Sequence, residues 1–194
     1  MARPDKYQSF AELRQHEVEG RDYQIRAAPV EGAGVAILAP HGGKIEFLTS
    51  ELAWSIAGSD YNCFAFEGIK RNHNADLHVT SSSFDEPNAL SLVARCNVVV
   101  TVHGLDGDAM EIQVGGRDTA LGERIDRELR EAGFASRVET AGPYAGADPD
   151  NICNRGRSGA GAQIEIRAGL RRALERDRGR FEAFVNAVRL AVAH

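Results

Sequence analysis

Residues 39–51 read APHGGKIEFLTSE and close an apolar run that starts at residue 34. The run predicts a buried strand that ends at Pro40. His41 and Glu46 follow on a segment that two glycines make flexible. Ligands and active sites collect where the strands of an α/β sheet end at their carboxyl edge, so this segment is the first candidate for a functional site.

Two more strand-like runs carry polar residues of the same kinds. The run 97–102, NVVVTV, is followed directly by His103, and the run 162–166, AQIEI, has Glu165 in its middle. Strand patterns alternate with helical patterns along the chain. The sequence therefore predicts an α/β protein, with residues 1–194 forming a single three-layer α/β/α domain around a mostly parallel mixed sheet.

Hydrophobic periodicity, glycines and capping residues place the other elements. Strands are predicted over residues 23–27, 35–39, 61–66, 97–102, 110–114, 137–139 and 163–166. Helices are predicted over residues 9–16, 49–58, 87–95, 118–132 and 169–176, with a last helix whose apolar face carries Phe181, Phe184, Val185, Val188 and Val192. Thr49 and Asp118 are expected to cap two of these helices.

Composition limits the classes of function. The chain has 194 residues and a hydrophobic fraction of 43%, which fits one globular domain. Its net charge of −5 does not indicate a basic surface for binding nucleic acid. No apolar run is long enough to span a bilayer, and the polar N-terminal stretch lacks the core of a secretory signal. Three cysteines without CxxC spacing indicate reduced thiols. We expect a cytoplasmic monomer without nucleic-acid or membrane partners.

The candidate residues suit a hydrolytic zinc ion. His41 and Glu46 are five residues apart, so on a helix they would point about 140° from each other, but on a flexible loop they can converge. His103 would arrive from another strand end. Two histidines and a glutamate are a usual ligand set for a catalytic zinc, which acidifies water and polarises a carbonyl. Glu165 would take the proton of that water and pass it to the leaving nitrogen.

Structural roles compete with this interpretation. A histidine after a strand is more often a hydrogen-bonded structural residue than a ligand, although two of them, each followed by glycine, make the two alternatives about equal. Glu165 is harder to explain structurally, because an unpaired buried carboxylate is costly. Spacing alone leaves the choice between a metal site and structural roles open. The metal hypothesis fails if the imidazoles of His41 and His103 lie more than about 7 Å apart.

Six stretches of the chain, in order, resemble the poly-γ-glutamate hydrolase family, which comprises small zinc-dependent proteins from phages and bacteria. They read HGGKIEFLTSELAWSIAG, YNCFAFEG, LHVTSSSFDEP, VVTVHG, NICNRGRSGAGAQIEI and GLRRAL, and they run from about Ala39 to Leu174. The resemblance implies an open α/β/α fold similar to the zinc carboxypeptidases, one Zn²⁺, and hydrolysis of the γ-linked amide of polyglutamate.

The resemblance also assigns residues. The histidine and glutamate of the family's HGGxIE motif fall on His41 and Glu46, and the histidine of its VHG motif falls on His103. The glutamate of its QLE motif falls on Glu165, where this chain reads QIE. These are the four residues that the strand ends and the chemistry of the side chains had already indicated.

Substrate-binding residues follow by analogy. An Asn-Arg pair binds the substrate carboxylate in carboxypeptidase-like enzymes, so Asn154 and Arg155 are candidates for that role, with Arg157 as a competing clamp. His78 has two alternatives, a substrate contact and a structural hydrogen bond. The arginine-rich run 167–180 is interpreted as a solvated helix face.

We therefore expect a zinc-dependent amidohydrolase that acts on polyglutamate or another acidic peptide. The first alternative is a carboxypeptidase or an N-acyl-amino-acid deacylase on the same scaffold. The second, from another class of function, is a non-catalytic binding protein related to phage replication.

Overall fold

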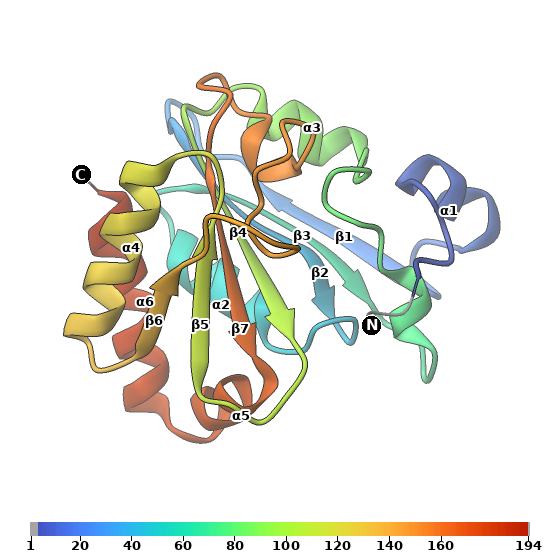
Figure 1. The fold of residues 1–194 in the computed structure, drawn as a ribbon. Helices are drawn as coiled ribbons and strands as arrows, with labels where there is room; N and C mark the ends of the chain where they lie inside the picture. Colours follow the sequence, from blue (N-terminus) through green and yellow to red (C-terminus); the bar gives the residue numbers. More distant parts are fainter. Residues whose placement is uncertain (1–3, 194) are drawn as a thin grey trace.

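Seven strands form one mixed sheet in the computed structural model of the protein, which describes residues 4–193 (Figure 1). The strands are β1 (Tyr23–Ala28), β2 (Val35–Gly43), β3 (Asn62–Gly68), β4 (Val98–Leu105), β5 (Glu111–Gly115), β6 (Ala135–Val138) and β7 (Ala162–Arg167). Their order across the sheet is β1-β3-β2-β4-β7-β5-β6. The four central strands are parallel, whereas β1 and the β5–β6 pair run in the opposite direction. The predicted fold, a single α/β domain with a mostly parallel sheet, is confirmed.

Six α-helices pack around this sheet in the described part of the chain. They are α1 (Phe10–His16), α2 (Thr49–Ala57), α3 (Pro87–Val93), α4 (Thr119–Glu131), α5 (Ala168–Arg176) and α6 (Arg178–Val192), with short 3₁₀ turns at η1 (Asn74–Leu77) and η2 (Ile152–Asn154). Asp118 caps α4 as predicted, by accepting a hydrogen bond from Leu121 N. The predicted cap at Thr49 is wrong, because α2 begins after Leu48 and the Thr49 hydroxyl donates instead to Glu46 O.

Alternating side chains of the central strands build two apolar cores. On β2, Ile37 and Ala39 enter the core beneath α2, α4, α5 and α6, whereas Ala36 and Leu38 enter the core beneath α1 and α3. Strand β3 divides its residues between the two cores in the same way. The period of two that places one apolar set on each face explains why these strands read as continuous hydrophobic runs.

The two faces of the sheet are covered unequally. Helices α2, α4, α5 and α6 cover one face, and β4 and β7 contribute five apolar side chains to the core there: Val100, Val102, Ala162, Ile164 and Ile166. On the other face, α1 and α3 pack mainly over β1, β3 and β2, whereas the short turn η2 packs on β4 and β7 (Figure 1). The polar side chains of β4 and β7 point to this second face, where no full helix layer covers them.

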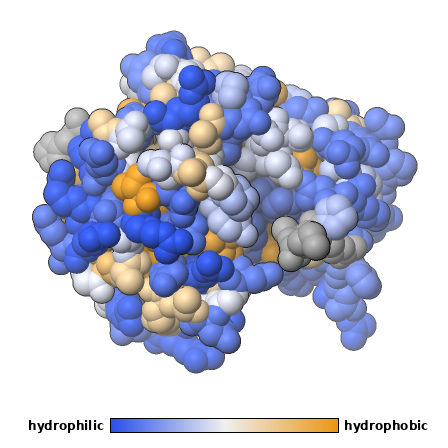
Figure 2. Space-filling view, in the orientation of Figure 1, coloured by the Kyte–Doolittle hydropathy of each residue, from blue (hydrophilic) through white to orange (hydrophobic). Residues whose placement is uncertain are grey.

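On the face drawn in Figure 2 hydrophilic residues predominate, and hydrophobic residues form small separate patches. Single exposed apolar residues are normal at a water-facing surface. Across residues 4–193, none of the helices has both the length and the apolar character that crossing a membrane requires.

Candidate metal and catalytic site

A β-bulge places His41 at the carboxyl end of β2. Ala39 pairs with Ala65 and Gly42 pairs with Glu67, so β2 advances three residues while β3 advances two. Pro40 lies in this bulge, and proline has no N–H to donate to the strand ladder. Beyond the bulge the strand continues to Gly43, so the prediction that it ends at Pro40 is wrong. Because a bulge bends the strand and redirects a side chain, His41 points to the open face of the sheet.

Glu46 returns to His41 through a tight turn. The backbone N–H of Glu46 donates to His41 O over 2.9 Å, and Gly42 gives the turn its close packing, since a Cβ there would lie 2.0 Å from Ser50 Oγ. The Oε1 atom of Glu46 lies 3.4 Å from His41 Nδ1. The predicted convergence of these two side chains thus occurs at the end of a strand and the turn that follows it.

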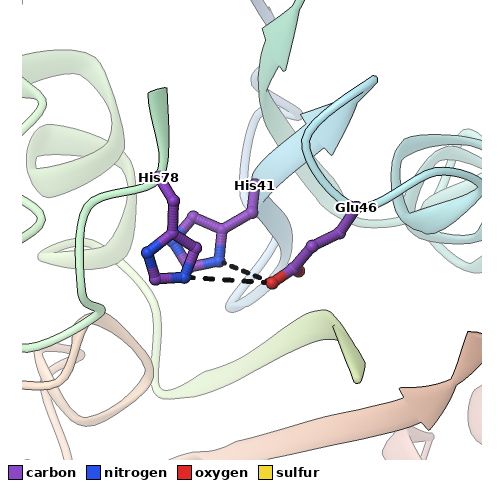
Figure 3. Close-up of side chains that lie close together, drawn as sticks. All are labelled: His41, Glu46 and His78. Carbon is purple, nitrogen blue, oxygen red and sulfur yellow. Dashed lines mark ion pairs between the residues drawn. The ribbon is translucent and has the colours of Figure 1, made fainter. Parts of the chain in front are cut away.

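His78 joins this pair from the segment after η1 (Figure 3). Its Nε2 lies 3.9 Å from Glu46 Oε1, and its ring centroid lies 4.0 Å from that of His41. The ligand atoms of His41, Glu46 and His78 all lie within 4.8 Å of one another, so this trio can hold a metal ion. From the sequence, His78 was predicted only to contact substrate or to make a structural hydrogen bond, because nothing in the local pattern shows that its loop folds back over β2.

Hydrogen bonds aim the two imidazoles at the cluster. His41 Nε2 lies 2.8 Å from Val79 O, and because a carbonyl oxygen can only accept, this nitrogen carries the proton and Nδ1 is free to bind a metal. His78 Nδ1 lies 2.6 Å from Asp5 Oδ1, which leaves Nε2 for the cluster. A metal-ligating histidine usually donates its other ring N–H to a carboxylate or a backbone carbonyl in this way.

His103 reaches the same point from β4. Its Nδ1 lies 3.2 Å from His41 Nδ1 and 3.8 Å from Glu46 Oε2. Two nitrogen ligands of a tetrahedral zinc lie about 3.3 Å apart, given Zn–N bonds of about 2.0–2.1 Å. The ring centroids of His41 and His103 are 5.1 Å apart, within the limit of about 7 Å that the metal hypothesis set. Within the described residues, His103 Nε2 is buried without a hydrogen-bond partner.

Glu46 is held as a carboxylate. Its Oε2 accepts a hydrogen bond of 2.8 Å from Gly104 N, which fixes one oxygen and leaves Oε1 facing the imidazoles. Burial alone would raise the pKa of Glu46, but the neighbouring His41, with His103 and His78, outweighs it and lowers the pKa to about 2. Burial and the nearby His41 lower the pKa of His103 to about 3. A carboxylate oxygen next to imidazole nitrogens is a suitable donor set for a divalent cation.

Glu165 lies beside His103, on the neighbouring strand β7. It pairs in register with His103 on β4 and with Gln113 on β5, so the three side chains share one face at one level. Gln163 Nε2 donates to Glu165 Oε1 over 3.2 Å. Burial, with the added charge of Glu46, raises the pKa of Glu165 well above its ordinary value. A carboxyl group with a raised pKa next to a metal cluster is suited to proton transfer.

A cavity of about 900 Å³ opens over these residues. One wall consists of strand residues of β2, β4 and β7, among them His41, His103, Gln163, Glu165 and Arg167. The other wall consists of loops, among them Asp5, His78, residues 80–82 and residues 142–148. We call these the strand wall and the loop wall.

Arg171 supports the strand wall from below. Its guanidinium donates to Ile166 O, Phe47 O and Leu105 O over 3.1, 2.8 and 3.2 Å, and the residue is only 3% exposed. These carbonyls belong to the ends of β7 and β4 and to the segment after Glu46. A Cβ on Gly104 would lie 2.4 Å from Arg171 Cζ, so glycine is needed there.

The burial of Arg171 corrects the interpretation of run 167–180 as a solvated helix face. Several arginines of this run are exposed, but Arg171 is buried. Its position next to the buried Leu170 and three residues before the buried Leu174 was the available sequence signal.

Asn154 and Arg155 lie differently from the substrate clamp that analogy implied. Asn154 is 2% exposed, and its amide is fully used inside the loop: Oδ1 accepts from Arg117 N and Gly161 N, and Nδ2 donates to Gly146 O and Asp148 O. Arg155 is exposed and is not among the described residues that line the cavity. The structure therefore brings His78 to the cluster but not this pair, and it adds Gln163 and Arg167, which sequence reasoning did not select.

Comparison with known proteins gives one family. Residues 7–185 match the sequence model of a family described as poly-gamma-glutamate hydrolase. The chain is 38% identical over 171 residues to UPF0714 protein YndL and 37% identical over 164 residues to UPF0714 protein YmaC, both of Bacillus subtilis. These matches cover 88% and 84% of this chain, and 67% and 69% of the respective relatives.

Two solved structures share the whole fold. A bacteriophage poly-gamma-glutamate hydrolase superposes with a TM-score of 0.92 at 32% identity, and the match covers 98% of this chain and 97% of that one. A form of YndL described as zinc-free superposes with a TM-score of 0.88, also at 32% identity, over 98% of both chains.

Proposed function

Because the chain belongs to the poly-γ-glutamate hydrolase family, and is thus a hydrolase, we propose that it cleaves the γ-linked amide bond of polyglutamate or of a related glutamyl substrate. The observation that carries the proposal is the meeting of four side chains from three strand ends: His41, Glu46, His103 and Glu165. They meet in one cavity that is large enough for a short peptide segment.

We propose that His41, Glu46 and His103 hold one zinc ion. The short distance between the Nδ1 atoms of the two histidines and the free Oε1 of Glu46 support this set. Bound there, zinc supplies Lewis-acid chemistry, since it acidifies water and polarises the scissile carbonyl. The description of one YndL structure as zinc-free implies a zinc site in that relative, and we extend it to this chain.

Glu165 is the proposed proton carrier. It accepts a proton from the attacking water and delivers it to the leaving amide nitrogen, so that the C–N bond breaks with a neutral amine as the product. Burial raises the pKa of Glu165, so its carboxylate is a stronger base than an exposed one. The hydrogen bond from Gln163 fixes Oε1 and leaves the other carboxyl oxygen for the proton.

His78 is proposed to face the substrate beside the metal. Its ring is oriented by Asp5, and its Nε2 points to the same side as Glu46 Oε1. It is also the competing third ligand, since His41, Glu46 and His78 can hold an ion without His103.

Metal content and turnover together test this assignment. Purified protein is expected to contain one zinc per chain, and His103→Ala is expected to lose both zinc and hydrolysis of γ-polyglutamate. His78→Ala is expected to keep zinc and to lose part of its turnover. If the two variants exchange these results, His78 is the third ligand.

Substrate choice separates the alternatives. Activity on α-peptides or acyl-amino acids, without activity on γ-polyglutamate, would favour the carboxypeptidase or deacylase alternative. A protein without zinc and inert on all three substrate classes would favour a non-catalytic binding protein.

The three cysteines, Cys63, Cys96 and Cys153, are free and buried, which supports the expected cytoplasmic setting.

A further inference from the structure

Three polar side chains alternate along β7 on the open face of the sheet. Gln163, Glu165 and Arg167 all line the cavity, whereas Ile164 and Ile166 enter the apolar core on the opposite face. In a strand, residues two apart lie on the same face about 7 Å from each other. A guanidinium thus lies one pleat beyond the proposed proton carrier.

Arg167 is the cationic side chain of this cavity. Among the described lining residues it is the one arginine or lysine. The same lining carries five acidic side chains: Asp5, Glu46, Asp106, Asp148 and Glu165. An anionic substrate that enters such a cavity needs a local positive charge to hold it, and Arg167 supplies one on the strand wall.

The guanidinium of Arg167 is anchored but not saturated. Its Nη1 donates to Asp106 O over 2.9 Å. Within residues 4–193, Nε is buried without an acceptor, and Nη2 makes no hydrogen bond. Because the buried Nε is closed to a ligand and Nη1 is held by Asp106, Nη2 is the donor that Arg167 can offer to a carboxylate. Arg155, by contrast, is exposed and outside the cavity.

The chemistry of a γ-linked chain indicates which carboxylate Arg167 would bind. In such a chain the amide nitrogen and the free α-carboxylate of each glutamate are attached to the same carbon. When Glu165 passes a proton to the leaving nitrogen, the α-carboxylate of the leaving residue is therefore two bonds away. A carboxylate this close to Glu165 is within reach of Arg167, one pleat further along β7.

We propose that Arg167 binds the free α-carboxylate of the glutamate that provides the leaving nitrogen, an inference that rests on the proposed function. Every residue of a γ-linked chain has this carboxylate, so the site can accept internal bonds as well as the last one. In an α-linked peptide the α-carboxylate is consumed by the next bond except at the C-terminal residue. The same site would therefore accept only the last bond of an α-peptide.

A variant combined with a modified substrate tests the contact. The substrate is a short γ-linked oligoglutamate, and its partner carries one α-carboxamide at the residue that provides the leaving nitrogen. Arg167→Met is expected to lower kcat/KM on the carboxylate substrate about 10–100-fold, the range for a hydrogen bond to a charged group. Wild-type protein should lose a similar factor on the carboxamide, and Arg167→Met should lose little more.

Three further variants make the result specific. Arg167→Lys keeps the charge without the planar fork and should recover part of the loss. Arg172→Met removes a nearby charge from the exposed side of α5 and should leave both substrates unaffected. Arg155→Met tests the residue that analogy favoured. A loss on Arg155→Met with none on Arg167→Met would overturn the proposal, as would an equal loss by Arg167→Met on both substrates.

Binding of the same two oligomers, measured by calorimetry, separates this inference from the proposed function. If wild-type protein binds the carboxylate oligomer more tightly than the carboxamide but does not cleave it, the proposed function fails and the Arg167 contact stands. If cleavage occurs but binding is equal for the two oligomers and unchanged by Arg167→Met, the proposed function stands and the Arg167 contact fails. Binding of neither oligomer overturns the contact.

Discussion

The two walls of the cavity are held in place by different forces. On the strand wall, His103 and Glu165 are fixed by the paired backbones of β4 and β7, in register with each other. On the loop wall, His78 has no strand neighbour, and its ring is held by one hydrogen bond to Asp5. The same carboxylate also accepts hydrogen bonds from the N–H and hydroxyl of Thr80.

Because of this difference, we expect substitutions in the two walls to have different effects. A strand ladder fixes a side chain by many backbone hydrogen bonds, so a substitution there removes a chemical group and leaves the frame intact. A loop held by a few side-chain contacts can open at lower free energy. Changes in the strand wall should therefore affect turnover or global stability, and changes in the loop wall should affect substrate binding and local motion.

Glu165→Gln should give the largest effect. The amide cannot accept a proton as the carboxylate does, so turnover is expected to fall about 10²–10⁴-fold while zinc content and the melting temperature stay near wild type. Steady-state kinetics with metal analysis measures both. Glu175→Gln, an exposed residue on α5, is the matched control. Retained turnover in Glu165→Gln would remove it from the proton-transfer role.

Arg171→Met should show how much the strand wall depends on its support. The variant loses three hydrogen bonds to backbone carbonyls and the positive charge that balances Glu46 and Glu165. We expect the free energy of unfolding to fall by about 2–4 kcal/mol, as for other buried polar networks. Urea denaturation measures it, and Arg172→Met should stay within about 0.5 kcal/mol of wild type. A similarly small change in Arg171→Met would show that strand pairing alone holds this wall.

Asp5→Ala should give a smaller effect of another kind. Without this carboxylate the His78 ring and Thr80 lose their shared acceptor, but the strand wall is untouched. We expect kcat/KM to fall about 10-fold, mainly through KM, with zinc content unchanged, since losing the support behind an imidazole costs about 10–100-fold at most. Loss of zinc in this variant would instead assign His78 to the metal.

Thiol labelling should reveal the smallest difference. Cys63 on β3 and Cys153 in η2 are both fully buried, and burial raises the pKa of each to about 12. Their thiols are thus equally poor nucleophiles, and labelling reports how often each region opens. Cys153, beneath the loop wall, is expected to react several times faster than Cys63, as read by mass spectrometry of digests. Equal rates would mean that the sheet and the loop wall open only together.

The contrast between the strand wall and the loop wall also explains which site residues could be predicted from the sequence. His41, Glu46, His103 and Glu165 could be selected because parallel strands end at a common edge, and apolar runs show where those strands end. The bulge at Pro40 was not predictable in detail, because it depends on the partner strand β3.

The residues that were missed depend on distant contacts. Asp5 meets His78 across 73 positions of the chain, and Arg171 meets Phe47 across 124. The four backbone partners of Asn154 could not be predicted either, because a loop amide has the same local signature whatever it binds. Such pairings are set by tertiary packing and leave no periodic pattern.

The alternation along β7 limits how this protein can change. Adding or deleting one residue between Gln163 and Arg167 would exchange the two faces of the strand, which would turn the carboxyl and the guanidinium into the apolar core and the isoleucines into the cavity. This strand can therefore tolerate exchange of one side chain for another, but not a change of length. We expect changes of length to be tolerated in the loops instead, so that a new substrate preference would come from remodelled loops over an unaltered β7.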